Sequence, residues 1–282
     1  MGSQPELVLT LVLSAAFLHA FWNALVKGAA DRTLMMGLVN VGHTVFGLVL
    51  ILIFLPPARE SWPFLVGSTF VHFFYYGFLL LSYRFGDLSQ VYPIARGISP
   101  PVVALTAWIV ADEVLPIAAW AGIIMVSCGI GMLVFARRGG LTNRKAISAA
   151  VVTGLTIATY TVIDGLGVRL SESPIGYIGW LFMLESFSSF YIFYIRREAL
   201  KSATVKMYTI GILGGIVSAL AYGLAIYAKS IASLGAVSAI RESSVIIAAM
   251  IGVIWFGERP WKIRILSACV VAAGVIILSQ AA

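Results

Sequence analysis

Two arginines, Arg96 and Arg241, lie inside apolar stretches that are long enough to cross a membrane. A charged side chain at membrane depth costs on the order of several kcal/mol, so each arginine indicates a functional site. A pair of guanidinium groups binds a carboxylate or a phosphate through charge-assisted hydrogen bonds. The alternative is that each arginine is neutralised inside the protein by a nearby acid or by carbonyl groups. Glu242 is the neighbour of Arg241 in sequence, but it does not lie on the same helical face.

Polar and aromatic side chains recur at helical spacing in several of these stretches. His19, Trp22 and Asn23 share one helical face, and a stripe of Thr153, Thr156, Tyr160 and Asp164 runs along another helix at steps of three and four. Aromatic rings combined with Arg, His and Asn suit a small amphipathic solute with an apolar body and an ionic head. The predicted substrate-binding residues are His19, Trp22, Asn23, Tyr75, Tyr92, Arg96, Thr156, Tyr160, Asp164 and Arg241.

Glu185 and Glu242 are the candidates for proton coupling, which needs a group that gains and loses a proton as occupancy changes. Burial disfavours the charged form of a carboxylic acid or an imidazole, so Asp164 and His19 are further candidates. Either glutamate could instead be a structural counter-ion.

No motif of catalysis or cofactor binding occurs in the sequence. It has no GxxxxGK[ST] phosphate loop and no HExxH, and its two cysteines form no metal or disulfide motif. We therefore expect no cofactor, no metal and no enzymatic activity, with transport driven by an ion or solute gradient. An intramembrane enzyme, a lipid-handling protein and a passive channel remain alternatives.

The elements that must position these residues are ten apolar stretches. Each is close to the ~20 residues that a helix needs to cross a bilayer. The composition is 60% hydrophobic and only 11% charged, which fits an α-helical membrane protein, and the stretches lack the alternation of barrel strands. The expected spans are residues 7–26, 34–55, 62–81, 88–111, 116–135, 146–166, 175–195, 207–228, 234–256 and 261–278.

The net charge of +7 is interpreted as membrane topology and not as a nucleic-acid-binding surface, because the basic residues fall mainly at helix ends. Most of the 19 Lys and Arg residues lie in one set of loops and adjoining helix ends, while Arg59, Arg169 and Lys229 are assigned to the other set. This bias places both termini outside the cytoplasm.

The chain repeats itself at a shift of 145 residues, which brings Arg96 onto Arg241 and Glu113 onto Glu258. An odd number of helices in each half makes the repeats inverted, as in many transporters. The predicted organisation is a first five-helix repeat at 1–136, a basic linker at 137–145 and a second repeat at 146–282. Both glutamates are interpreted as solvated residues of short turns.

Three prolines, Pro93, Pro100 and Pro101, flank Arg96 and predict a break or kink that exposes carbonyl groups to a cavity, or one that only shapes packing. The fifth and tenth spans carry small residues seven apart that permit close helix approach. This seam would join either the two halves or two monomers; it consists of Gly122, Gly129, Ser267 and Gly274.

Segments 106–133 (TAWIVADEVLPIAAWAGIIMVSCGIGML) and 251–278 (IGVIWFGERPWKIRILSACVVAAGVIIL) resemble the closing helix pair of EamA repeats, the unit of the drug/metabolite transporter superfamily. Segments 91–100 (VYPIARGISP) and 237–244 (VSAIRESS) are similar to the fourth and ninth EamA helices. The resemblance implies a ten-helix carrier of small metabolites in a membrane of the bacterial inner type. Ten-helix relatives often have cytoplasmic termini, which differs from the charge bias.

These observations together predict a secondary transporter of an amphipathic anion or zwitterion, with amino-acid-like solutes preferred, working as an exporter or exchanger. The alternative is a proton-coupled exporter of cationic drugs. The expected partners are a small-molecule substrate and the lipid bilayer, with no nucleic acid, and the protein is expected to be a monomer or a homodimer.

Overall fold

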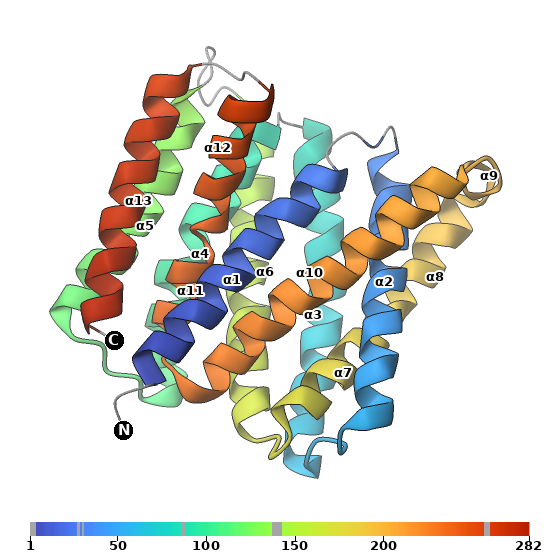
Figure 1. Ribbon diagram of the computed structural model, residues 1–282, viewed down its shortest axis with the longest axis horizontal. Helices are drawn as coiled ribbons and strands as arrows, with labels where there is room; N and C mark the ends of the chain where they lie inside the picture. Colours follow the sequence, from blue (N-terminus) through green and yellow to red (C-terminus); the bar gives the residue numbers. More distant parts are fainter. Residues whose placement is uncertain are drawn as a thin grey trace.

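A computed structural model describes residues 4–26, 29, 31–85, 88–136, 143–256 and 260–281 as an all-helical protein (Figure 1). Ten helical segments are long and apolar enough to cross a membrane, which confirms the ten predicted spans. The elements are α1 (Gln4–Val26), α2 (Arg32–Ile53), η1 (Arg59–Ser61), α3 (Trp62–Phe85), α4 (Leu88–Ala111), α5 (Ile117–Met132), η2 (Leu133–Ala136), α6 (Arg144–Arg169), α7 (Pro174–Leu184), α8 (Ser186–Ile195), α9 (Arg197–Lys201), α10 (Val205–Ile231), α11 (Leu234–Arg241), α12 (Ser244–Phe256) and α13 (Trp261–Ala281).

Two of the spans are divided into shorter helices. The seventh divides into α7 and α8 at Glu185, and the ninth divides into α11 and α12 at Glu242 and Ser243. The prolines of the fourth span do not break it, because α4 continues through all three of them. Both breaks therefore occur in the second half of the chain, at positions without proline.

Helix starts follow from local capping. The side chain of Asp31 accepts a hydrogen bond from the backbone N–H of Leu34 at the start of α2, and Asn143 accepts bonds from the first amides of α6. Thr204 does the same at the start of α10. Such caps satisfy amides that have no partner within the helix, so each places a helix start.

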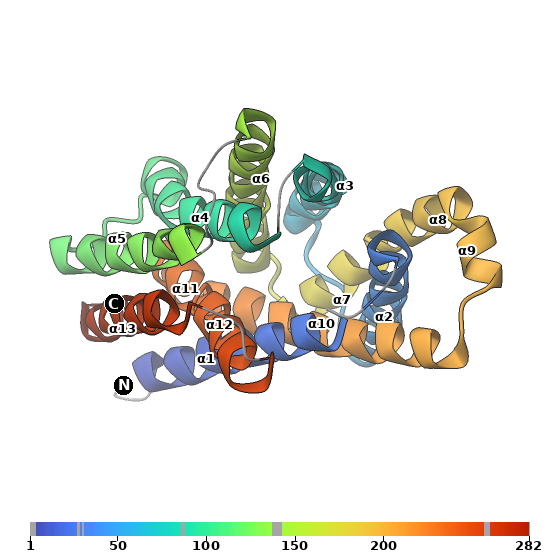
Figure 2. The same ribbon diagram turned by 90° about the horizontal axis from the view of Figure 1, so that it is seen from above.

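The two halves of the chain are interlocked. The most extensive helix pairings, α3 with α6, α5 with α13, α1 with α10, α2 with α10 and α4 with α6, each join a helix before the 137–145 linker to one after it. Figure 2 shows α1 and α10 along one side of the molecule and α4, α6 and α3 along the other. α1 and α6 are the first spans of the two halves, and α3 and α10 are the third spans. In each half the first span packs against the third span of the other half, α1 on α10 and α6 on α3, which is consistent with the expected inverted repeat.

Glycines allow α5 and α13 to cross closely. A Cβ on Gly122 would lie 2.9 Å from the carbonyl oxygen of Gly274, and one on Gly129 would lie 3.2 Å from that of Ser267. The small-residue seam of the fifth and tenth spans thus joins α5 to α13 within one chain. The sequence left open whether this seam joins the two halves of one chain or two monomers, and in the structure it joins the two halves.

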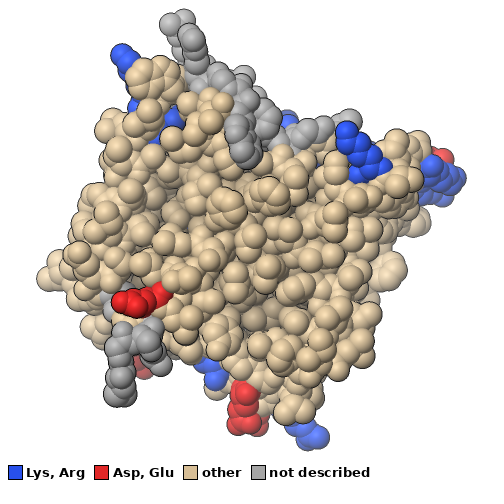
Figure 3. Space-filling view, in the orientation of Figure 1, with Lys and Arg blue, Asp and Glu red and all other residues tan. Residues whose placement is uncertain are grey.

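Charged residues lie toward two opposite ends of the molecule, and a broad band between them is almost free of Lys, Arg, Asp and Glu (Figure 3). Many large apolar side chains are exposed, among them Phe70, Leu52 and Ile109. In a water-soluble protein such a surface would be costly, whereas lipid tails solvate it. Both chain termini lie at the same end of the bundle (Figure 1).

Candidate substrate-binding site

The two arginines converge on one carboxylate. Arg96 from the middle of α4 donates from one terminal nitrogen to both carboxylate oxygens of Glu242, at 3.0 and 3.2 Å. Arg241, the last residue of α11, donates to the same carboxylate at 2.9 Å. All three side chains are buried, and Glu242 is 0% exposed. The convergence expected from the repeat is present, and the neutralising acid is Glu242.

The prediction that Glu242 points away from Arg241 is wrong. It assumed a continuous ninth helix, in which consecutive side chains diverge by about 100°. The helix instead ends at Arg241, and Glu242 adopts φ −69° and ψ −8°, which turns its side chain toward both guanidinium groups.

His19 of α1 completes this group, because the second terminal nitrogen of Arg96 donates to its Nε2 at 2.8 Å. A neutral imidazole accepts at only one nitrogen, so this contact puts the ring proton on Nδ1 and leaves His19 uncharged. The Trp22 indole, 3.3 Å from Nδ1, is then an edge contact to the ring and not a second donor. Asn23 donates to the His19 carbonyl of its own helix.

Tyrosine rings surround the arginines. The Arg96 guanidinium lies 5.3 Å from the centre of the Tyr92 ring, and that of Arg241 lies 5.5 Å from the Tyr222 ring. Tyr160 from α6 packs edge-on against Tyr222 with ring centres 5.9 Å apart, and Tyr75 packs against Tyr160 at 5.5 Å. Cation–π contacts of this kind hold guanidinium groups in an apolar setting. Tyr222 was not singled out in the sequence.

Asp164 lies in a second buried group beyond Tyr222. The hydroxyls of Tyr222 and Tyr177 donate to its two carboxylate oxygens, at 2.5 and 3.3 Å. Lys229 of α10 is 0% exposed, donates weakly to the Thr161 carbonyl at 3.4 Å and lies 5.2 Å from the Tyr222 ring. Thr156, also predicted for the site, is half-buried and donates to the carbonyl of Thr153 in its own helix.

The assignment of Lys229 to a loop or helix end is corrected by this position. Its apolar stretch was expected to stop at residue 228, but α10 continues to Ile231 and carries the lysine inward. Tyr222 and Lys229 are seven residues apart, which puts them on one helical face. That spacing could have indicated from the sequence that Lys229 lies inside the bundle.

Glu185 is held elsewhere in the bundle, by two histidines. It occupies the turn between α7 and α8, where His43 Nδ1 of α2 lies 3.3 Å from one carboxylate oxygen and His72 Nε2 of α3 lies 3.4 Å from the other. The His72 ring stacks on Tyr160 with centres 4.0 Å apart. The buried charged residues therefore form three clusters, around Glu242, Asp164 and Glu185. Tyr160 lies between them, because it packs on Tyr222 and on His72.

Glu113 has a structural role that a solvated turn residue would not have. It accepts hydrogen bonds from Arg169, the last residue of α6, at 2.5 Å, and from the backbone N–H of Leu234, the first residue of α11, at 2.8 Å. It therefore links the α4–α5 turn to the end of α6 and the start of α11. The corresponding Glu258 lies outside the described residues.

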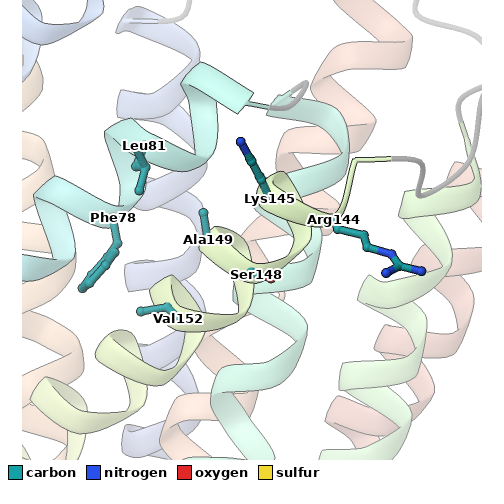
Figure 4. A pocket seen from close by; sticks show the side chains of 7 residues that line it. All are labelled: Phe78, Leu81, Arg144, Lys145, Ser148, Ala149 and Val152. Carbon is teal, nitrogen blue, oxygen red and sulfur yellow. The ribbon is translucent and has the colours of Figure 1, made fainter.

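Within the described part of the chain, no group of three or more His, Cys, Asp or Glu side chains is arranged to hold a metal ion. A hollow of about 360 Å³ lies away from these clusters, between α3 and α6 near the start of α6. Figure 4 shows its lining, with Phe78 and Leu81 from α3 and the remaining side chains from α6. None of the predicted site residues borders it.

The group of Arg96, Arg241, Glu242 and His19 carries one net positive charge, because two guanidinium groups face one carboxylate and a neutral imidazole. An excess positive charge inside an apolar bundle attracts an anionic group, and the tyrosine rings around it accept an apolar body.

Comparison with known proteins agrees with this architecture. The profile of the EamA-like transporter family matches residues 144–280. A solved structure described only as the crystal structure of a protein superposes with a TM-score of 0.78 at 16% sequence identity, covering 96% of this chain and 95% of that chain. At that identity the match shows the fold alone. No curated protein sequence matches the chain closely enough to count as a relative.

The family match covers residues 144–280, the second half of the chain. Together with the ten apolar helices, it indicates an EamA-like transporter of the ten-helix form.

Proposed function

We propose that the protein is a secondary transporter of small amphipathic anions or zwitterions, with amino-acid-like solutes preferred. The observation that carries the proposal is the pair of buried arginines that share one carboxylate, which leaves one positive charge uncompensated. A substrate carboxylate compensates that charge, whereas a cationic substrate would add to it.

Arg241 is the proposed anchor for the substrate carboxylate. Its contact with Glu242 uses one of the five N–H donors of a guanidinium group, so donors remain for a second carboxylate. Arg96 is more fully engaged, since it contacts both Glu242 and His19. The apolar part of the solute would pack against Tyr160, Tyr222 and Tyr75, as aromatic rings favour.

The proposed mechanism is alternating access around this group, with 1–136 and 146–282 as the two repeats and 137–145 as their linker. The interlocked pairings support a relative tilting of helices and not a separation of two independent bodies. We place the protein in a bacterial inner membrane with the basic end in the cytoplasm and both termini outside it, working as an exporter or exchanger, as a monomer or homodimer.

A cationic-drug exporter coupled to protons is the second candidate. Its support is the carboxylate of Asp164, which lies at the end of the row of tyrosines. Lys229 beside the same ring offsets that negative charge, so the anionic or zwitterionic substrate is preferred.

Binding decides between the two. Purified protein is screened by thermal shift against amino acids, organic acids, phosphorylated metabolites and lipophilic cations, and each hit is then tested for saturable counterflow in liposomes. Ligand binding stabilises the folded state by mass action. An anionic or zwitterionic hit should weaken more than tenfold in Arg241→Gln, since a hydrogen bond to a charged group contributes about 1.5–3 kcal/mol.

The matched control is Arg197→Gln, which removes the same charge from a side chain that is 74% exposed. Equal affinity in Arg241→Gln and Arg197→Gln would remove the arginine site from the proposal. Stabilisation by cations alone would favour the drug-exporter alternative.

A further inference from the structure

The two buried glutamates at helix breaks differ in one respect. Glu242 faces two arginines, whose guanidinium groups keep their charge at any physiological pH. Glu185 faces two histidines, and an imidazole ring can be either neutral or protonated. Of the two arrangements, only the second surrounds the glutamate with side chains that can themselves take up or release a proton.

The hydrogen bonds of His72 fix where its proton lies. Nδ1 is 2.9 Å from the carbonyl oxygen of Ser68, and because a carbonyl only accepts, Nδ1 carries hydrogen. The other nitrogen, Nε2, faces Glu185 at 3.4 Å. A neutral His72 would turn a lone pair toward a carboxylate, which is repulsive. One proton on His72 or on Glu185 makes the contact attractive.

His43 supplies a second position for a proton. Its Nδ1 faces the other carboxylate oxygen of Glu185 at 3.3 Å, while its Nε2 is buried and has no hydrogen-bond partner within the part of the chain that the structure describes. The side chain is 9% exposed. An unpartnered imidazole nitrogen beside a buried carboxylate is an acceptor for a proton that arrives there.

We propose that His43, Glu185 and His72 form a proton-binding site that drives transport, separate from the substrate group around Glu242. The proposal rests on the proposed function for its role in transport, but not for proton binding itself. The site joins the two halves of the chain, since both histidines come from the first half and Glu185 from the second. Gain or loss of the proton changes the attraction between the halves at this point.

The other titratable groups around the cluster belong to the elements packed against it. Tyr76 of α3 donates to Asn40 of α2, whose amide in turn donates to Ser188 of α8. On the α6 and α10 sides, His72 meets Tyr160 at 4.0 Å and Tyr222 at 6.0 Å, with Asp164 bonded to the Tyr222 hydroxyl. Tyr222 also lies against the Arg241 guanidinium, and Tyr160 packs on Tyr222, so the proton site and the substrate group share a wall of aromatic rings.

The first test measures proton binding without substrate. Infrared difference spectra of the purified full-length protein, recorded between about pH 8 and about pH 5, report protons gained by buried carboxyl and imidazole groups. We expect the unchanged protein to give a signal that titrates in this range. In Glu185→Gln the midpoint of that signal should move by about one pH unit or more, or the signal should disappear. The control Glu198→Gln alters a glutamate that is 72% exposed and should leave the signal in place.

The second test measures coupling in liposomes with radiolabelled leucine, which has an apolar body and a zwitterionic head. Glu185→Gln should keep leucine counterflow, which needs no net proton movement, and lose accumulation driven by a pH gradient. His72→Gln should give the same division and serves as a second variant if Glu185→Gln does not fold.

The outcomes separate the two proposals. Absence of counterflow in the unchanged protein rejects leucine transport, while the infrared signal still decides whether the proton site exists. An infrared titration that is identical in Glu185→Gln and the unchanged protein overturns the proton site. Accumulation that stays driven by a pH gradient in a folded Glu185→Gln protein overturns its role in coupling.

Discussion

Replacing Glu242 by Gln should destabilise the protein strongly. The change keeps the shape of the side chain but removes the carboxylate that both guanidinium groups contact, at 3.0 Å from Arg96 and 2.9 Å from Arg241. Removing one partner of a buried ion pair costs about 3–5 kcal/mol, because the remaining charge is buried without compensation. Here two charges are left, so the upper part of that range is expected.

This loss is large enough to measure by fluorescence-detected thermal unfolding of the purified protein. A loss of 1 kcal/mol lowers Tm by about 2–4 °C in chains of roughly this size. With a loss of about 4–5 kcal/mol, Glu242→Gln should therefore unfold about 8–20 °C below the unchanged protein. Glu198→Gln removes the same charge at a side chain that is 72% exposed, and its effect should stay within about 0.5 kcal/mol.

A double variant tests the charge argument directly. Arg96→Gln combined with Glu242→Gln restores the original net charge of the group, so it should be less destabilised than the sum of the two single changes. Neighbouring residues of one network typically couple by about 0.5–3 kcal/mol. Additive losses, or a Glu242→Gln protein that unfolds at the same temperature as the Glu198→Gln control, would refute the shared-carboxylate reasoning.

Two further changes test the framework that holds the site. Gly215→Ala at the α2–α10 crossing puts a Cβ against the carbonyl oxygen of Val39, so it should cost about 1–3 kcal/mol in thermal unfolding. Gly77→Ala, whose Cβ would meet no described atom within 4 Å, should cost nothing, and equal losses at the two glycines would contradict the close crossing. Glu113→Ala should cost about 0.5–2 kcal/mol through loss of the hydrogen bond from the Leu234 amide, measured in the same way. An unchanged unfolding temperature would show that this amide finds another partner.

The spans could be predicted from the sequence because bilayer thickness alone fixes their length and apolar composition. The expected 34–55 is α2 (Arg32–Ile53), and the expected 261–278 is α13 (Trp261–Ala281). The division of the seventh span could not be predicted in this way. Glu185 and Ser186 are not helix breakers. At the turn, the backbone N–H and the hydroxyl of Ser188 both donate to the Glu185 carbonyl, and this local bonding replaces the regular helical pattern.

The internal repeat made the meeting of Arg96 and Arg241 predictable, since equivalent positions of inverted repeats approach one another near the middle of the membrane. Their counter-ion was not predictable, because it depends on a turn of the backbone at Glu242 that no residue type in the sequence announces. Lys229 was missed for a related reason. Near the end of an apolar stretch a lysine is expected at the membrane surface, and here the helix carries it into the bundle instead.

At both helix breaks in the second half of the chain the C-cap residue is a glutamate. Glu185 is the C-cap of α7, and Glu242 is the C-cap of α11. Sequence alone does not separate their roles, because Arg96 and His43 approach these glutamates from helices more than a hundred residues away. The partners separate their roles. Two arginines contact Glu242 in the proposed substrate group, and two histidines contact Glu185 in the proposed proton-binding site. Changes around Glu242 should therefore alter which solute is carried, and changes around Glu185 should alter how its movement is driven.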